Sequence, residues 1–399
     1  MINIIPILLS QISLQERIDL ELKDIPTKIM FDYVSFIQQF DISLLYRLVC
    51  EKKYTMPISK TIFMKTKKLD ELTFSYEYNL CESIFTLPKS QILLNHITKL
   101  KFDTYGKYSP FPNLSIYVKN IKYLSIDFSC EGNHKNAVKF FEDLIEFISV
   151  QNNLEYFIIN IKYNLSGSII HMEKWRELFF KLSESHSIKY IMIKGCFDGE
   201  QTDLNFLSNC SNLEELHLDS MIIDYDKLLC LKNIYLHNTL KELKIILRIE
   251  SVKQNNLKSI LDDLSLYCQN LTLIGLKLEH IFGYINKEKV DEILNEFKSL
   301  SLPKTLKSLS FEGVIELNHL EEIMKNYIDN LINLDFYYYT CVNVLERDID
   351  EMTKNKKLKL RYDKEKISFG GKFIYRYFLD FNYPWLASHE MDGKVLNLE

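Results

Sequence analysis

The sequence of 399 residues predicts an α/β fold, a solenoid in which short parallel strands stack into an inner sheet and helical segments connect them. Three observations predict it: a short apolar pattern that recurs along most of the chain, connecting segments with helical periodicity, and a balanced composition. Apolar residues make up 47% and charged residues 26%, as expected for a folded protein.

The recurring pattern has apolar residues at its first, fourth and sixth positions, which favours a short strand beside an apolar interior. Ten copies start between Leu69 and Leu331 at intervals of 24 to 35 residues, with a mean of about 29. Their triplets are Leu69/Leu72/Phe74, Ile97/Leu100/Phe102, Ile121/Leu124/Ile126, Leu154/Phe157/Ile159, Ile188/Ile191/Ile193, Leu213/Leu216/Leu218, Leu240/Leu243/Ile245, Leu271/Ile274/Leu276, Leu306/Leu309/Phe311 and Leu331/Leu334/Phe336. Asn, Ser or Thr precedes most copies. One repeat cannot shield its own triplet from water, so stacked neighbours and end caps are required.

Several connecting segments carry apolar residues at helical spacing. The sets are Val138, Phe141, Ile145 and Ile148; Leu257, Ile260, Leu261 and Leu264; Val290, Ile293, Leu294 and Phe297; and Leu320, Ile323, Met324, Ile328 and Leu331. Alternation of strand and helix predicts the parallel sheet. We expect residues 345–399 to cap the last repeat, with a charged helix at 346–357 and an aromatic segment, Phe373 to Trp385, folded back over Phe336.

The N-terminal part has a different pattern. A helical lead-in over residues 1–24 is followed by a helix-start signal at Asp24 and Pro26, and Asp41 is placed to cap a second helix. Such a small helical unit buries little surface alone and needs the repeats or a partner. The predicted domains are therefore 1–66, the lead-in and helical unit, 67–344, the solenoid, and 345–399, the cap.

The helical unit resembles an F-box over residues 25 to about 54. The residues that carry this resemblance are Ile25-Pro26, Ile29-Met30, Tyr33-Val34, Ile37, Phe40-Asp41-Ile42, Leu44-Leu45 and Leu48-Val49-Cys50. The repeats resemble the leucine-rich repeats that follow F-boxes. That family places Asn or Cys three residues after the third apolar position, where only Cys196 matches, so we expect its side-chain ladder to be largely missing.

The resemblance implies a substrate-recruiting adaptor of a cullin-RING ubiquitin ligase. The residues implied to dock on a Skp-type adaptor protein are Ile25, Pro26, Ile29, Met30, Leu44, Leu45, Leu48 and Val49. The alternative is a leucine-rich-repeat scaffold or inhibitor-like binding protein without a ubiquitin link, in which the helical unit only caps the stack.

Composition and motifs favour a binding protein over other classes. A net charge of -5 with scattered lysines gives no case for nucleic acid, and no apolar run is long enough to span a membrane. The eight single cysteines indicate reduced, mostly buried thiols. The apolar run from Ile4 to Leu9 lacks the flanks of a signal peptide. We expect a cytoplasmic or nuclear protein without cofactor, metal or catalytic activity, since no catalytic motif is present.

A parallel repeat sheet offers its outward side chains as a surface. We expect an unknown protein substrate to bind the mixture of aromatic and charged residues there, because aromatics dominate affinity and charges set register. The predicted substrate-binding residues are Tyr123, Asp127, Tyr156, Tyr190, Lys194, Glu215, His217, Asp219, Lys244 and Tyr337. His217 should point away from the core. Ordinary solvated strand surface is the alternative.

Overall fold

The computed structural model divides the chain into two compact units, residues 1–222 and 223–399. Its described residues are 15, 18, 37–42, 45, 52–75, 85, 87, 89–104, 109–129, 134–161, 169–197, 204–221, 239–248, 262, 264–279, 305–306, 308–312, 333–339, 359–361, 367–369 and 372–380.

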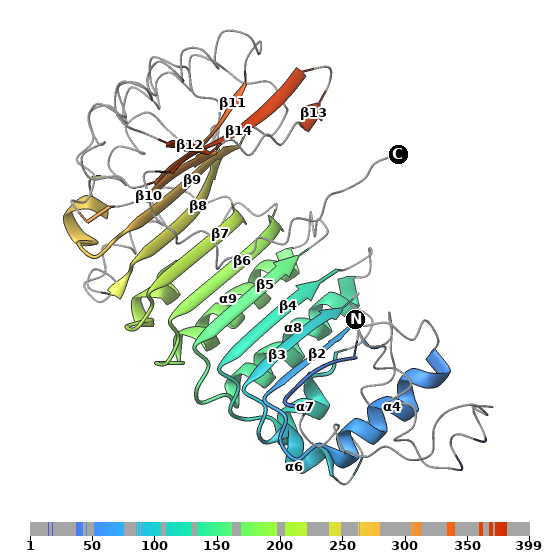
Figure 1. The fold of residues 1–399 in the computed structure, drawn as a ribbon. Coiled ribbons are helices and arrows are strands. Elements are labelled where there is room, and N and C mark those ends of the chain that lie inside the picture. The colour runs from blue at the N-terminus through green and yellow to red at the C-terminus, as the bar shows by residue number, and fades with distance from the viewer. Residues whose placement is uncertain are drawn as a thin grey trace. The chain divides into compact units, whose positions relative to one another are not determined.

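The first unit contains a parallel sheet whose strands follow one another in chain order (Figure 1). The strands are β1 (Gln39–Asp41), β2 (Glu71–Ser75), β3 (Lys99–Thr104), β4 (Tyr123–Phe128), β5 (Tyr156–Ile161), β6 (Tyr190–Phe197) and β7 (Glu215–Met221). The predicted α/β class and the parallel sheet are confirmed.

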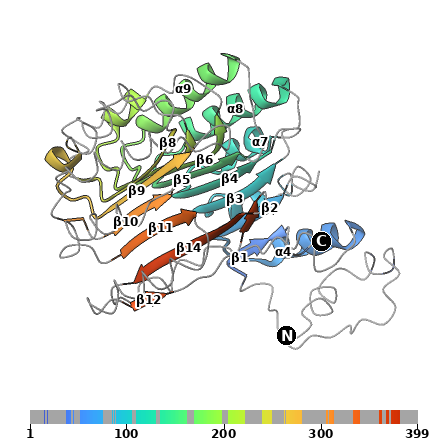
Figure 2. The ribbon, with the colours of Figure 1, turned by 90° about the horizontal axis from the view of Figure 1, so that it is seen from above.

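The connecting segments of this unit form a helical layer, and Figure 2 shows α7, α8 and α9 against one face of the strands. The helical elements are α4 (Lys52–Lys65), α6 (Ser90–Leu94), α7 (Phe111–Tyr117), α8 (His134–Ser149), α9 (Ile169–Ser183) and the 3-10 helix η2 (Leu204–Asn209). In α8 the predicted helix is present but its buried side is rotated from the expected one. Phe141 and Ile148 are buried, whereas Val138 and Ile145 are only half-buried. The bulky Phe140, Leu144 and Phe147 face the core instead.

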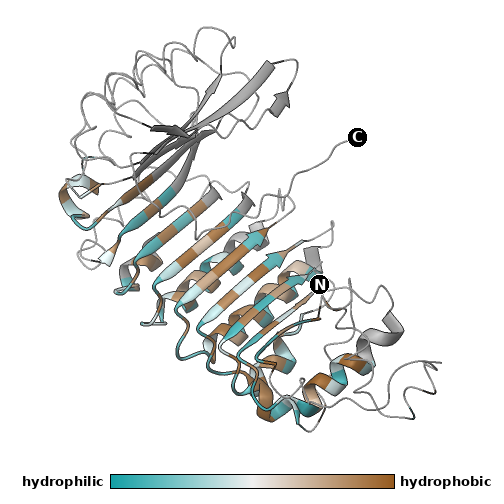
Figure 3. Ribbon diagram, viewed as in Figure 1, coloured by the Kyte–Doolittle hydropathy of each residue, from teal (hydrophilic) through white to brown (hydrophobic). Residues whose placement is uncertain are grey.

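The apolar triplets fill the core between the sheet and this helical layer. In the triplet Ile121/Leu124/Ile126, as in Leu154/Phe157/Ile159, every side chain is fully buried. The residues between them are half-buried or exposed, so burial alternates along each strand as the two-residue period requires. Figure 3 shows this alternation as apolar and polar bands across the strands.

Phenylalanine rings link successive repeats within the core. Phe140 of α8 lies 4.4 Å from Phe128 of β4, 5.6 Å from Phe111 of α7 and 6.1 Å from Phe102 of β3, between ring centroids. Phe102 in turn stacks on Phe74 of β2 at 5.6 Å. These rings join three strands to two helices, and aromatic pairs of this geometry contribute beyond their buried area.

Polar residues just before the triplets tie each repeat to the one before it. Ser187 Oγ donates to the carbonyl of Leu154 at 2.9 Å, and Asn212 Nδ2 donates to the carbonyl of His186 at 2.6 Å. The main chain adds a second link, because the carbonyl of Glu155 accepts hydrogen bonds from the N–H groups of both Lys189 and Tyr190. Backbone groups at the strand entrances are therefore satisfied without the family's Asn ladder.

The N-terminal region contains a repeat that was not predicted from the sequence. Gln39–Asp41 forms β1, paired in parallel with β2, with Phe40 opposite Leu72. Ile37, Phe40 and Ile42 therefore form an eleventh triplet, in which Phe40 and Ile42 are buried. Asp41 directly precedes the helical residue Ile42, which is where the second helix was predicted to begin. The strand before this helix was not predicted. The sheet thus begins inside the segment predicted to be a separate helical unit.

The second unit repeats the parallel arrangement and then reverses direction. Phe336 of its last parallel strand lies opposite Tyr377 of an antiparallel strand, so residues 373–380 of the predicted aromatic segment lie beside the strand of Phe336, and the rest of the segment lies outside the described residues. The parallel strands are β8 (Glu242–Arg248), β9 (Leu273–Glu279), β10 (Ser308–Glu312) and β11 (Asn333–Tyr339), and β14 (Lys372–Asp380) pairs with β11, β12 (Lys359–Arg361) and β13 (Ile367–Phe369).

Several predicted connectors of the second unit lie outside the described residues. These are the segments 290–297, 320–331 and 346–357. Of the segment 257–264, Leu264 is described as helical and buried. Within the described parts of the chain, every helix falls short of the length and apolar character that crossing a bilayer requires.

Candidate functional site

The sheet of the first unit has one face that the helices do not cover, and we call the outward residues of β3 to β7 on it the open face. Because the strands pair in register, equivalent positions of successive repeats lie side by side in three rows. The first row is Lys99, Tyr123, Tyr156, Tyr190 and Glu215; the second is Lys101, Ser125, Ile158, Met192 and His217; the third is Asp103, Asp127, Asn160, Lys194 and Asp219.

Three tyrosines of the first row form what we call the tyrosine ladder. The ring centroids of Tyr123 and Tyr156 are 6.1 Å apart, and those of Tyr156 and Tyr190 are 6.0 Å apart, with interplanar angles of 34° and 33°. The similar spacing and tilt follow from the repeat, since each ring occupies the same position of its own strand. Tyr156, in the middle, is 39% exposed, so the ladder presents aromatic surface to solvent.

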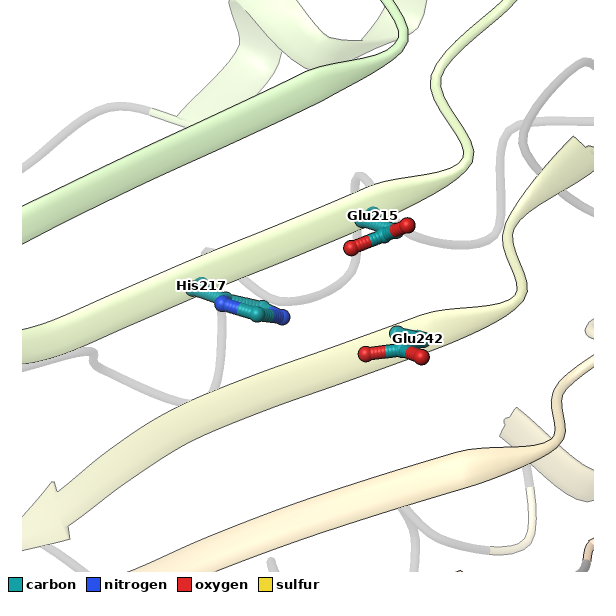
Figure 4. A group of neighbouring side chains, drawn as sticks. All are labelled: Glu215, His217 and Glu242. Carbon is teal, nitrogen blue, oxygen red and sulfur yellow. The ribbon is translucent and has the colours of Figure 1, made fainter. Parts of the chain in front are cut away.

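His217 extends the ladder onto β7. Its ring meets the Tyr190 ring edge-on at 5.1 Å, and Tyr190 Oη lies 3.1 Å from His217 Nδ1. Figure 4 shows Glu215 and His217 projecting from the same side of β7, as residues two apart on a strand must. His217 thus points away from the core as predicted, but it is only 8% exposed. This packing makes it part of the ladder's support rather than a solvated side chain.

The opposite end of the ladder carries a positive charge held over a ring. Lys101 Nζ lies 5.6 Å from the centroid of the Tyr123 ring and 2.9 Å from Glu71 Oε1. Burial lowers the pKa of Lys101, but the hydrogen bond and the negative charge of Glu71 outweigh burial, so the net pKa is raised. Lys101 is therefore a fixed cation on the face of Tyr123.

A carboxylate at the strand entrances holds two lysines beside the ladder. Glu155 accepts a hydrogen bond of 2.8 Å from Lys189 Nζ, and Lys122 Nζ lies 3.6 Å from its other oxygen. The hydrogen bond from Lys189 and the two positive charges lower the pKa of Glu155 despite partial burial. Since Lys122, Glu155 and Lys189 belong to successive repeats, these ion pairs join the entrances of β4, β5 and β6.

The open face presents aromatic, charged and polar groups that can contact a partner. Its polar groups are lysine amines, the His217 imidazole, carboxylates, the Asn160 amide and tyrosine and serine hydroxyls, whereas the two cysteines described as free are buried. Burial raises the pKa of Cys210 and of Cys268 to about 12, which leaves both thiols protonated and unreactive near neutral pH. For these two cysteines the prediction of buried, reduced thiols is confirmed.

The predicted substrate-binding residues divide between the two units. Eight of them share the open face by register: Tyr123, Asp127, Tyr156, Tyr190, Lys194, Glu215, His217 and Asp219. Lys244 belongs to β8 and Tyr337 to β11, both in the second unit. Glu242, the third residue labelled in Figure 4, also belongs to β8. Ile158 and Met192 were not among the predicted binding residues, although they give the second row its apolar centre. Strand alternation predicts them on the same outward stripe as the tyrosines, but only aromatic and charged residues of that stripe were predicted to bind.

The predicted adaptor-docking residues lie almost wholly outside the described residues. Leu45 alone is described, and it is 5% exposed, so its side chain packs within this chain. The roles of Ile25, Pro26, Ile29, Met30, Leu44, Leu48 and Val49 stay predictions.

No protein-family model matches the chain, and no curated protein matches its sequence.

Proposed function

We propose that the protein is a leucine-rich-repeat solenoid that recruits another protein through the open face. The tyrosine ladder supports this proposal most directly. Tyrosine provides large contact area at low conformational cost and is enriched at the centres of protein interfaces. A row of aligned, partly exposed rings flanked by charges of both signs fits a protein partner, because the rings supply affinity while the charges select orientation.

The partner-binding role is tested by affinity purification of the full-length chain. We expect Tyr156→Ala to lose partners that wild-type protein retains, because it removes the central ring of the ladder. Tyr117→Ala serves as the matched control, since Tyr117 lies in the helical layer and accepts a hydrogen bond from Gln91. Equal recovery of the same proteins by all three forms would contradict recruitment through the open face.

The resemblance at residues 25–54 supports a narrower role, that of a substrate-recruiting F-box-type adaptor of a cullin-RING ubiquitin ligase. In this role the segment docks on a Skp-type adaptor while the repeats hold the substrate. The adaptor docks through the predicted residues other than the buried Leu45, and the chain itself performs no transfer of ubiquitin.

Strand β1 favours a second candidate, a scaffold or inhibitor-like binding protein without a ubiquitin link. Phe40 and Ile42 are buried in the core and β1 pairs with β2, so this part of the F-box-like segment has a structural role as the first repeat. A segment that begins the stack is what the capping alternative requires.

Direct binding to a purified Skp-type adaptor, measured by calorimetry, distinguishes the two roles. Replacing the buried Leu45 would test folding rather than docking. We therefore choose Pro26→Glu combined with Leu48→Glu, and expect an F-box protein to lose adaptor binding while its circular dichroism spectrum is unchanged. Absence of binding by the wild-type chain, or equal binding by the variant, would exclude the ubiquitin ligase role.

A further inference from the structure

We propose that the open face binds an extended polypeptide segment that crosses the strands along the tyrosine ladder, with arginine or lysine at alternate positions. This inference rests on the proposed function and names the chemistry of its partner. It depends on three properties of the face: the spacing of the rings, their capacity to hold cations, and the sign of the neighbouring charges.

The ring spacing matches the side-chain spacing of an extended chain. Neighbouring rings of the ladder are 6.1 and 6.0 Å apart. Alternate residues of an extended chain are roughly 6.6 Å apart and point to the same side. A segment that runs from β4 to β6 therefore presents one side chain to each successive ring without a change of register. A helix also brings every fourth residue to one side after roughly 6 Å of rise, but each such step rotates about 40° around the helix axis, so three successive side chains do not face the ladder equally.

The chain itself contains an example of the contact that we assign to the partner. Lys101 Nζ stands 5.6 Å from the centroid of Tyr123, within the range of a cation–π interaction. Tyr156 and Tyr190 repeat the same ring on the next two strands, with similar tilts. Tyr156 is also the most accessible rung, at 39% exposure, so a second cation placed by a partner meets it first.

The second row suits the aliphatic part of such side chains. Ile158 and Met192 lie two residues beyond Tyr156 and Tyr190 and are half-buried. Arginine and lysine stems pack along apolar surface while their charged ends stay in water. The apolar centre next to the rings therefore accommodates the stems of cations that sit over the ladder.

The neighbouring charges favour a basic partner over a phosphate-bearing strand. The three rows of the open face hold four acids, Asp103, Asp127, Glu215 and Asp219, against three lysines, Lys99, Lys101 and Lys194, so acids are in slight excess. Lys101 is already paired with Glu71 at 2.9 Å. The whole chain carries a net charge of -5. Aromatic rows also stack nucleic acid bases, but such sites track the phosphates with a positively charged groove, which this face lacks among its described residues.

Binding of labelled peptides to the full-length chain, measured by fluorescence anisotropy, tests the inference. The probe is a peptide of about eight residues with arginine and threonine alternating. Its isomer, with all threonines before all arginines, has the same composition and charge but the wrong spacing. We expect the alternating peptide to bind at least about fivefold more tightly than the isomer, and its glutamate analogue not to bind.

Variants locate the binding on the ladder. Tyr156→Ala should weaken the alternating peptide about fivefold, Tyr156→Phe should retain binding because the ring remains, and Tyr117→Ala should leave it unchanged. Equal affinity for the two isomers, or equal loss in Tyr156→Ala and Tyr117→Ala, overturns the inference. A third result also overturns it: every peptide binds weakly, and a neutral oligosaccharide such as maltohexaose displaces what peptide is bound. The rings would then form a sugar-binding platform.

The outcome is separable from that of the proposed function. If the peptides fail while Tyr156→Ala still removes a co-purifying protein, the open face recruits a partner of different chemistry and only this inference is wrong. If Tyr156→Ala affects neither peptide nor protein partners, both fail together.

Discussion

The two faces of the first sheet use aromatic residues in opposite ways. On the core face, Phe102, Phe111 and Phe140 are almost wholly buried and contact rings of both strands and helices. On the open face, Tyr123 and Tyr156 contact rings of neighbouring strands and remain partly exposed. In-register repetition aligns rings on both faces, so alignment alone does not distinguish them. The degree of burial distinguishes the two faces. Rings enclosed by helices stabilise the fold, and rings that remain partly exposed are available for a partner.

Phe140→Ala should produce the largest loss of stability. Phe140 is 1% exposed and contacts the rings of Phe102, Phe111, Phe128 and Phe141, so truncation leaves a cavity that the rigid sheet cannot fill. We expect the free energy of unfolding to fall by about 3 to 5 kcal/mol, measured by urea denaturation.

Phe180→Ala is the matched control for that cavity. Phe180 lies on α9 and is 55% exposed, so its removal should cost well under about 1 kcal/mol. Similar losses for the two variants would mean that the rings of the core face do not stabilise the fold as described.

Gln151→Ala should have the next largest effect, because it removes a polar link between repeats. Gln151 is 6% exposed; it accepts a hydrogen bond from Ile121 N–H and donates to the carbonyl oxygens of Val118 and Phe147. The variant leaves these backbone groups buried without their partner, at a cost of about 1 to 3 kcal/mol by urea denaturation. The neighbouring exposed Asn152→Ala should be near neutral. A neutral Gln151→Ala would contradict the linking role.

Tyr156→Ala should have a small effect on stability and a large one on binding, which sharpens the contrast between the faces. Tyr156 is 39% exposed, and its ring is tilted by 34° and 33° against the rings of Tyr123 and Tyr190. We expect a loss of less than about 1 kcal/mol in thermal unfolding. A loss as large as that of Phe140→Ala would show that the ladder supports the fold.

Glu155→Gln should give the smallest effect, dependent on pH and salt. The lowered pKa of Glu155 means that its carboxylate form stabilises the folded state. That contribution is complete above the ordinary value of 4.5 and disappears as the pH falls through the lower folded pKa. Because the lysine partners are substantially exposed, we expect at most about 1 kcal/mol at neutral pH, less in high salt. A difference that persists at low pH or in high salt would contradict the ion-pair explanation.

Sequence periodicity was sufficient to predict β2 to β11, because triplets such as Ile121/Leu124/Ile126 follow the two-residue period of a half-buried strand. It also predicted the open face, since Tyr123, Tyr156 and Tyr190 hold equivalent positions. The first repeat was missed because its triplet, Ile37/Phe40/Ile42, lies within residues that also fit a helical motif, and local pattern cannot decide between the two.

Other features depend on packing that one sequence does not reveal. The buried side of α8 is set by the volumes of Phe140 and Phe147, whose partners lie on other elements. His217 is only 8% exposed and has the Tyr190 ring of another strand beside it, and this burial could not be predicted from strand alternation. A return of the aromatic segment to Phe336 was predicted, but the antiparallel pairing of its residues 373–380 with the strand of Phe336 was not.

The links at the strand entrances have a consequence for how this protein can vary. Each strand is registered by hydrogen bonds to the repeat immediately before it, so the length of the intervening connector does not affect the match. The intervals of 24 to 35 residues between triplets are thus compatible with straight rows. Gain or loss of one whole module would lengthen or shorten the open face by one strand and leave the remaining strands in place.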